Sequence, residues 1–351
     1  FFFPMEDFCM KMRMTVVAAL FAACFAATAA IAAEFHVEVV SKGFQHDFWK
    51  QVNRGCTAAG EEFGATVNFV GPASESNIAE QIDQLANAVN KKPSAICFAA
   101  LSPESSMDLI YQAADAGIPV VTFDSDIGGD TGGAVKAFVA TDNKDAGAAA
   151  ATEMYNKLKD KIASSSQPVH IGVLSQDTTS QSVGDRTIGF IEKMVALCGA
   201  DKTSVEGHVK YNKELSGAKV VLDVGIPAET TDAQMNTVVQ TVFNKPNLLG
   251  AYASNEFAAK GMVNVNETLN VLGPDKVVGI GFDSGIVQVG AVKDRTLYGA
   301  ITQNPYMIGY LSVKTAIEAA KKQPVKDIAV PFYFYTADNM AQSEIASCLY
   351  E

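Results

Sequence analysis

Short runs of apolar and β-branched residues alternate with longer amphipathic stretches along most of the chain. In its first part this pattern predicts strands at 36–40, 66–70, 95–99 and 119–123, separated by helices at 47–63, 77–90 and 107–116. Strands that alternate with helices in this way form a parallel sheet with helices on both faces. We therefore expect a parallel α/β unit in the first part of the chain.

The same alternation starts again after a strand at 136–140. Here we expect helices at 144–161, 181–197, 231–243, 257–269 and 286–293, and strands at 169–174, near 205–210, and at 248–253, 277–281 and 297–302. The aromatic residues at 332–335 alternate with a period of two and predict one more strand of this second unit. Two similar α/β units in tandem predict two Rossmann-like lobes with parallel sheets and a ligand cleft between them.

The first 33 residues have the features of an export signal. Lys11 and Arg13 precede an apolar run at 15–25, and the small residues at 30–33 suit a signal peptidase. A membrane anchor is the alternative, but a spanning helix needs about 20 strongly apolar residues, and this run is shorter and rich in alanine. We therefore expect a signal peptide at 1–33, cleavage near Glu34, and a periplasmic or extracytoplasmic location. Cys24 leaves a lipid-anchored form open.

The chain is acidic, with a formal net charge of −12. Removal of the signal peptide leaves this charge unchanged, because the segment contains two basic and two acidic side chains. Binding to nucleic acid requires a basic face that neutralises phosphates, and the sequence offers none. We expect no nucleic-acid partner.

Four cysteines remain after cleavage, namely Cys56, Cys97, Cys198 and Cys348. They are widely spaced, without a CxxC pair, and four cysteines in so long a chain do not make a disulfide framework. We expect free thiols, although an oxidising compartment leaves one bridge open.

Motifs for cofactors, metals and catalysis are missing from the sequence. Gly279-Ile280-Gly281 ends a strand, but Ser284 stands where a dinucleotide fingerprint needs glycine. The four histidines are scattered without metal-ligand spacing, and no phosphate-binding loop or serine-hydrolase elbow occurs. We expect no cofactor, no metal and no enzymatic activity.

Polar residues with forked or planar ends follow most of the predicted strands. In parallel sheets of this kind, ligands bind outside the carboxyl ends of the strands. For any one of these residues, helix capping is an alternative explanation. Together they suit a sugar, whose hydroxyls both donate and accept and whose C–H faces pack on aromatic rings. The candidates are Gln45, His46, Phe48, Trp49, Asp124, Ser125, Asn143, Arg186, Asn255, Asp283 and Gln303.

Several stretches together resemble the ribose-binding-protein-like periplasmic binding proteins of sugar ABC transporters, over essentially all of residues 35–340. The resemblance depends on their order and spacing. The stretches are Ser41-Lys42-Gly43 with His46 and Phe48-Trp49, residues 118–125, Ala140-Thr141-Asp142-Asn143, Arg186 with Gly189-Phe190, Ala253-Ser254-Asn255-Glu256, residues 278–283 and residues 303–310.

The resemblance implies roles for the residues of the first lobe. Phe48 and Trp49 match the aromatics that sandwich the sugar ring, and Asp124 matches a carboxylate that accepts from ring hydroxyls. Gln45 or His46 matches the polar residue before the aromatics, and a one-residue insertion leaves both open.

For the second lobe, the resemblance implies that Arg186, Asn255 and Asp283 contact the ligand, with Gln303 at a hinge strand. Asn143 lies at the first crossover between the lobes. Ribose binders carry an arginine where this chain has Ser125, so the identity of the sugar stays open.

The resemblance also implies three crossovers, near 141–142, 303–304 and 331–332. The first lobe would contain residues 35–141 and 304–331, and the second residues 142–303 and 332–351. Such a protein is expected to be a monomer that captures a monosaccharide or related small polyol and delivers it to an ABC transporter permease in the membrane.

Three alternatives differ in function. A periplasmic ligand sensor that feeds a chemoreceptor or sensor kinase has the same fold, and the sequence does not separate it from a transport protein. A related transcription repressor would have a helix-turn-helix where this chain has a signal peptide. A sugar-cleaving enzyme needs two acids, which Asp124 and Asp283 could supply, but both match hydroxyl acceptors.

Overall fold

The computed structural model describes residues 35–44 and 46–350. The expected signal peptide, with its cleavage site and Cys24, and the candidate residue Gln45 lie outside the described residues.

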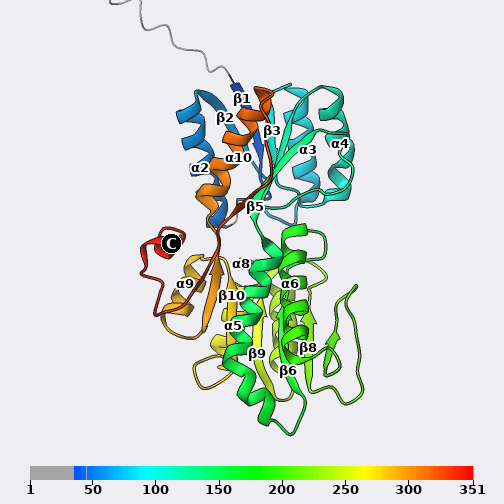
Figure 1. The fold of residues 1–351 in the computed structure, drawn as a ribbon. Helices are drawn as coiled ribbons and strands as arrows, with labels where there is room; N and C mark the ends of the chain where they lie inside the picture. The colour runs from blue at the N-terminus through cyan, green and yellow to red at the C-terminus, as the bar shows by residue number, and fades with distance from the viewer. Residues whose placement is uncertain (1–34, 45, 351) are drawn as a thin grey trace, which may run out of the picture. The chain divides into compact units, whose positions relative to one another are not determined.

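The first sheet has six strands in the order β12-β5-β4-β3-β1-β2, and all neighbouring pairs are parallel (Figure 1). α2 and α10 pack on one face of this sheet, and α3 and α4 on the other. The strands are β1 (Phe35–Val40), β2 (Ala65–Val70), β3 (Ala95–Phe98), β4 (Val120–Phe123), β5 (Val135–Thr141) and β12 (Ile328–Val330). The helices are α2 (Asp47–Phe63), α3 (Ile78–Asn90), α4 (Pro103–Asp115) and α10 (Pro305–Ala320).

The second sheet has seven strands in the order β13-β11-β10-β9-β6-β8-β7, of which only the β11–β13 pair is antiparallel. The strands are β6 (Val169–Leu174), β7 (Thr203–Glu206), β8 (Val220–Gly225), β9 (Leu248–Ala253), β10 (Val278–Phe282), β11 (Gly299–Thr302) and β13 (Tyr333–Tyr335). The helices are α5 (Asn143–Ser164), α6 (Gln181–Cys198), α7 (Asp232–Phe243), α8 (Glu256–Leu269), α9 (Ile286–Lys293) and the short α11 (Ser343–Ala346). α5 and α6 cover one face, and α7, α8 and α9 the other.

Burial on both faces explains the composition of the central strands. Every residue of β3, β4 and β10 is buried, because helices pack on both faces of these strands. Their sequences are therefore continuous apolar runs and lack the alternation of a half-exposed strand. In β1, Val37 and Val39 face the core with α2 and α10, while Val40 faces the core with α3 and α4.

One strand of the second sheet was missed from the sequence. The single strand expected near 205–210 is β7 at 203–206, and β8 at 220–225 pairs with both β7 and β6. Asp223 interrupts the apolar run of β8. In the structure its buried carboxylate lies 2.7 Å from Nδ1 of His170 and 2.6 Å from Nζ of Lys245. These partners make an acidic residue compatible with a central strand.

The chain passes between the two sheets more than once. It enters the second sheet after β5, returns to the first through α10 and β12, and crosses again between β12 and β13. The strand expected within 332–335 is confirmed as β13. The four cysteines of the described residues are free thiols.

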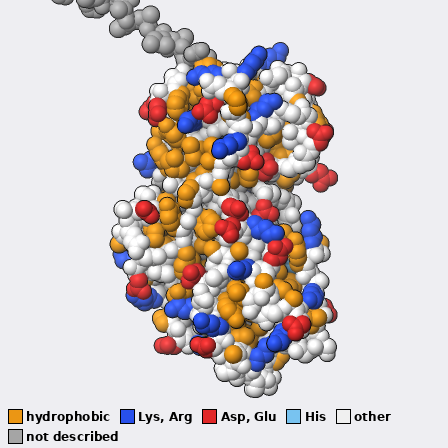
Figure 2. All heavy atoms as spheres, in the orientation of Figure 1, with side chains coloured by type: hydrophobic (Ala, Val, Ile, Leu, Met, Phe, Trp, Pro, Cys, Tyr) orange, Lys and Arg blue, Asp and Glu red, His pale blue; other side chains and the backbone are white. Residues whose placement is uncertain are grey.

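The face of the molecule in Figure 2 carries acidic and basic side chains interspersed with apolar ones. None of the helices in the described part of the chain is both long enough and apolar enough to cross a membrane.

Candidate ligand-binding site

A cavity lies where the carboxyl ends of the two sheets meet. Most of its walls are polar or charged, with Phe48 and Val183 as apolar elements. The residues that line it are Lys42, His46, Phe48, Glu75, Asp124, Val183, Arg186, Asn255, Glu256, Asp283 and Gln303. The structure therefore brings together seven of the residues expected from the sequence.

Two equivalent turns supply carboxylates from opposite sides. Asp124-Ser125 follows Phe123, the last residue of β4, and Asp283-Ser284 follows Phe282, the last residue of β10. Asp124 has a φ of 56° and Asp283 a φ of 75°, a left-handed conformation that aspartate tolerates better than most residues. Each backbone N–H still donates to the neighbouring strand, from Asp124 to Val139 O at 3.1 Å and from Asp283 to Ile301 O at 2.6 Å. The turns therefore direct both side chains into the cavity.

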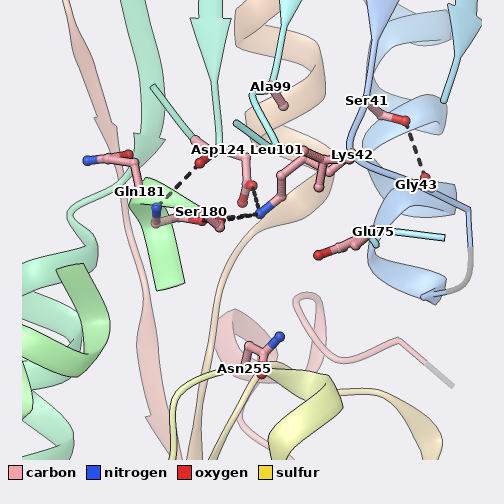
Figure 3. A network of polar contacts seen from close by, with 12 residues as sticks. Ser41, Lys42, Gly43, Glu75, Ala99, Leu101, Asp124, Ser180, Gln181 and Asn255 are labelled. Atoms are coloured by element: carbon pink, nitrogen blue, oxygen red, sulfur yellow. Dashed lines mark hydrogen bonds and ion pairs between the residues drawn. The ribbon is translucent and has the colours of Figure 1, made fainter. Parts of the chain in front are cut away.

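Lys42 supplies a buried cation beside Asp124. Its Nζ lies 3.1 Å from Asp124 Oδ2 and donates to the hydroxyl of Ser180 at 3.2 Å (Figure 3). It also donates to the hydroxyl of Ser182 at 3.2 Å. Burial acts to lower the pKa of Lys42, but the carboxylates of Asp124 and Glu75 outweigh it and raise that pKa above its ordinary value. A cation thus stands next to Asp124 although Ser125 occupies the position at which the resemblance implies an arginine.

Arg186 lies between the two carboxylates. Its Nη2 is 3.9 Å from Asp124 Oδ1, and its Nη1 is 3.7 Å from Asp283 Oδ2. The guanidinium also stacks on Phe282, with Cζ 4.0 Å from the ring centroid. Burial raises the pKa of Asp283, and the charge of Arg186 partly offsets that effect. One arginine therefore neutralises acids from both sheets.

Asn143 holds Arg186 from behind the cavity wall. Its Oδ1 accepts from Arg186 Nε at 2.8 Å, and its Nδ2 donates to the carbonyl oxygen of Asp124 at 3.4 Å. α5 and α6 approach each other so closely here that a Cβ on Gly147 would lie 2.1 Å from the carbonyl oxygen of Arg186. Glycine is needed at this crossing, and Asn143 acts on Arg186 and Asp124 without lining the cavity.

The sequence led us to expect Trp49 in the lining of the cavity, but the structure places it behind the lining. Its side chain is 1% exposed and packs edge-on against Phe48, with ring centroids 4.9 Å apart. Its Nε1 donates to Glu75 at 2.8 Å. Phe48 forms the aromatic wall, and Trp49 supports Phe48 and Glu75 from behind because the two residues are adjacent on α2 and point in different directions.

Glu75 is a second acid of the first half of the molecule, the part built on the first sheet, and its side chain is partly buried. Gln176, from the second half, donates to it at 3.3 Å. Burial acts to raise the pKa of Glu75, but the charges of Lys42 and His46 lower it below its ordinary value. Glu75 is therefore ionised at neutral pH.

His46 meets Glu256 across the cavity, with Nδ1 3.5 Å from Oε1. Burial acts to lower the pKa of His46, whereas Glu256 and other nearby carboxylates raise it above its ordinary value. His46 is the N-cap of α2 and Glu256 the first residue of α8, so this contact links the two halves of the molecule.

The remaining candidates have their own partners. Asn255 accepts from Ala258 N as the N-cap of α8, at 3.1 Å, and donates to Gln176 at 2.6 Å. Gln303 Nε2 donates to Asp283 Oδ1 at 2.7 Å. Ser125 is buried behind the wall, where its hydroxyl accepts from Ser182 N at 3.3 Å. Asn255 thus caps α8 and also lines the cavity. Ser125 does not line the cavity but forms a hydrogen bond between the two halves of the molecule.

Buried acceptors without hydrogen-bond donors occur at the cavity. Among the described residues, no hydrogen bond reaches Glu256 Oε2 or Gln303 Oε1. Burying such an acceptor unpaired is unfavourable, so these atoms favour a ligand that presents donors.

Lys42, Glu75, Glu256 and Val183 line the cavity but were not among the candidates. Lys42 lies two residues after the end of β1, and Glu75 lies in the loop after β2. The strand-end rule could have found both, because both lie between a strand and the next helix. Glu256 is the first residue of α8, where its charge also suits the helix dipole.

Comparison with known proteins identifies the family. The model of the periplasmic binding protein domain matches residues 37–324. The chain therefore belongs to the periplasmic binding protein domain family, which confirms the resemblance and the α/β fold class expected from the sequence.

Three known proteins show what the chain is similar to. The D-allose-binding periplasmic protein of Escherichia coli (strain K12) is 25% identical over 292 residues, which cover 82% of this chain and 85% of that protein. A solved structure of an Agrobacterium vitis ABC transporter solute-binding protein with bound D-fucose is 30% identical, with a TM-score of 0.77. The match covers 90% of this chain and 100% of the chain in that structure. A Brachyspira murdochii structure, described as an ABC transporter, LacI family transcriptional regulator, is 34% identical, with a TM-score of 0.78. The match covers 91% of this chain and 99% of the chain in that structure.

Proposed function

We propose that this chain is an extracytoplasmic solute-binding protein that captures a monosaccharide and delivers it to an ABC transporter permease. The observation that carries the proposal is the pair of carboxylates Asp124 and Asp283, one from each sheet, with Arg186 between them. Relatives that bind D-allose and D-fucose support the sugar class.

The ligand is a neutral sugar or polyol. Four buried or partly buried acids line the cavity, namely Glu75, Asp124, Glu256 and Asp283. Lys42 and Arg186 are already engaged by these acids. A sugar acid or sugar phosphate would bring further negative charge next to the carboxylates, whereas neutral hydroxyls donate to them.

The two halves act as lobes that close on the ligand, with residues 35–141 and 304–331 in one and 142–303 and 332–351 in the other. Asp124 and Phe48 contact the sugar from the first lobe, and Asp283, Asn255 and Arg186 from the second. Affinity then depends on the closed population, because contacts to both lobes exist only there. The permease recognises this closed form.

The chain binds its ligand without chemical conversion. The acids of the cavity are paired with cations: Asp124 with Lys42, Asp283 with Arg186, and Glu256 with His46. A carboxylate that already contacts a cation is suited to accept hydrogen bonds from sugar hydroxyls, whereas a sugar-cleaving enzyme needs a pair of acids of which one donates a proton to the leaving group.

A thermal-shift screen of the purified protein tests the function. Neutral monosaccharides, deoxysugars and inositols are compared with the sugar acids and phosphates of the same stereochemistry. A ligand at 100 times its dissociation constant adds about 2.7 kcal/mol to the free energy of unfolding. We expect stabilisation by at least one neutral sugar and none by its acid or phosphate. Stabilisation by the charged forms alone would contradict the proposed ligand class.

A further inference from the structure

The end of the described chain returns to the cavity from behind. Residues 336–350, which we call the C-terminal segment, follow β13 and run back toward the start of α9, in red in Figure 1. Ile345 packs in a core of the second half, whereas Tyr350 packs in a core of the first. Both side chains are buried. The segment therefore contacts both halves of the chain.

The turn that carries Asp283 is held by this segment and by β13. The hydroxyl of Tyr335, on β13, donates to the carbonyl oxygen of Asp283 at 3.0 Å. The next N–H, of Ser284, donates to the hydroxyl oxygen of Tyr350 at 3.4 Å. The Ser284 hydroxyl donates to the carbonyl oxygen of Cys348 at 3.1 Å. A left-handed residue such as Asp283 persists only where its surroundings hold it, and these bonds fix the two groups that follow its Cα.

Tyr350 also supports the aromatic wall. Its ring meets Phe48 edge-on, with centroids 6.3 Å apart and planes at 67°. On another side, Phe48 meets Trp49. Tyr350 thus touches the aromatic wall with its ring and the carboxylate turn with its hydroxyl, while lying outside the cavity lining.

The equivalent turn of the first sheet is held differently. The carbonyl oxygen of Asp124 accepts from Asn143 Nδ2 at 3.4 Å, and Ser125 accepts from Ser182 N at 3.3 Å. These donors come from the start of α5 and of α6. Only the turn at Asp283 relies on tyrosine hydroxyls from β13 and the C-terminal segment, within the part of the chain that the structure describes.

We propose that Tyr335 and Tyr350 are positioning residues for ligand binding: they hold the Asp283 carboxylate, and Tyr350 also holds the Phe48 ring. Neither touches the ligand. The effect on sugar affinity rests on the proposed function, whereas the effect on Phe48 concerns the unliganded protein.

Removal of single hydroxyls tests the hold on Asp283. Tyr335→Phe and Tyr350→Phe each delete one hydrogen bond to the turn. Tyr252→Phe is the matched control, because the buried Tyr252 hydroxyl has no hydrogen-bond partner among the described residues. A sugar that stabilises the wild type is titrated well below the melting temperature of each variant. We expect affinity to fall about 5-fold in each variant and about 20-fold in the double variant, with less than a 2-fold change in the control. A purely structural role would lower the melting temperature and leave affinity unchanged.

Tyr350→Ala tests the hold on Phe48 without any sugar. Trp49 is the only tryptophan of the chain and contacts Phe48, so its emission reports the position of that ring. We expect a shifted emission in unliganded Tyr350→Ala and the wild-type emission in Tyr350→Phe, which keeps the ring. Wild-type affinity in both hydroxyl variants overturns the role at Asp283, and unchanged emission in Tyr350→Ala overturns the role at Phe48. If no sugar stabilises the wild type, the proposed function fails. The Trp49 emission of Tyr350→Ala then still shows whether Tyr350 positions the Phe48 ring.

Discussion

The ammonium of Lys42 lies 3.1 Å from the Asp124 carboxylate, and both side chains are almost completely buried. Lys42 comes from the end of β1 and Asp124 from the end of β4, yet the Lys42 ammonium also reaches Ser180 and Ser182 before and within α6. This contact therefore combines charge neutralisation in the first half with a link to the second.

Lys42→Met leaves Asp124 buried with only Arg186, at 3.9 Å, as a cation. Removing one partner of a buried pair costs about 3–5 kcal/mol, and we expect about 3 kcal/mol here because Arg186 remains. Urea unfolding measures the loss. The double variant Lys42→Met/Asp124→Asn should recover much of this loss, because the side chain at position 124 no longer carries a charge. A single variant as stable as the wild type would show that the pair is not formed.

Arg186→Lys should lower both ligand affinity and the stability of the unliganded protein. Lysine keeps the charge but loses the forked geometry that contacts Asn143, Asp124 and Asp283. We expect about 1.5–3 kcal/mol less binding free energy, the range for a hydrogen bond to a charged group. Calorimetric titration and thermal melts of one preparation measure the two effects. Arg295→Lys is the control, since the pair of Arg295 with Asp338 is exposed. An unaltered affinity would assign Arg186 to the fold alone.

Phe48→Ala should weaken sugar binding more than Trp49→Phe does. Phe48 lines the cavity, and loss of its ring contact with the sugar should cost about 1–3 kcal/mol. Trp49→Phe keeps an aromatic ring behind Phe48 but removes the hydrogen bond to Glu75, so we expect a loss of about 1 kcal/mol. Titration of both variants with the same sugar measures the difference. The reverse order would place Trp49, and not Phe48, against the ligand.

The stability of the unliganded protein should depend on His46 above neutral pH. The pKa of His46 is raised in the folded protein, so the contact with Glu256 contributes fully below the unfolded value of about 6.5. That contribution is lost as pH rises through the higher folded pKa. Urea unfolding should therefore show that the free energy of unfolding of the wild type declines between pH 6 and 9. This decline should be smaller in His46→Gln. His208→Gln, whose histidine has a lowered pKa, is the control. Parallel pH profiles for wild type and His46→Gln would rule the contact out as a source of stability.

The fold was largely predictable because both sheets are covered by helices. β4 and β10 are apolar runs that each end in Phe and are followed by Asp-Ser. Such runs mark buried parallel strands, and the ends of these two strands form part of the site. β8 was not predictable from its apolar pattern alone, because Asp223 interrupts that pattern. The structure accommodates this acid through His170 and Lys245, which come from other elements. Such compensation depends on tertiary contacts that the local sequence does not contain.

Two of the four carboxylates that line the cavity were predictable from the sequence, and the supporting groups were less so. Asp124 and Asp283 follow strands and could be chosen on that basis. Which of Phe48 and Trp49 faces the cavity depends on the rotation of α2, which is set by packing against α10. The role of Lys42 depends on its reach to Ser180, 138 residues later in the chain. Positions that distant are brought together only by the fold.

Calorimetric titration of one stabilising sugar into wild type, Asp124→Asn and Asp283→Asn tests the central claim most directly. Asparagine keeps the size of each side chain and removes its charge. If the sugar is held by carboxylates from both sheets, each variant should lose about 10- to 100-fold in affinity, the equivalent of one hydrogen bond to a charged group. Asp338→Asn, at an exposed pair, should bind as the wild type does. Wild-type affinity in either cavity variant would contradict a ligand held between the two sheets.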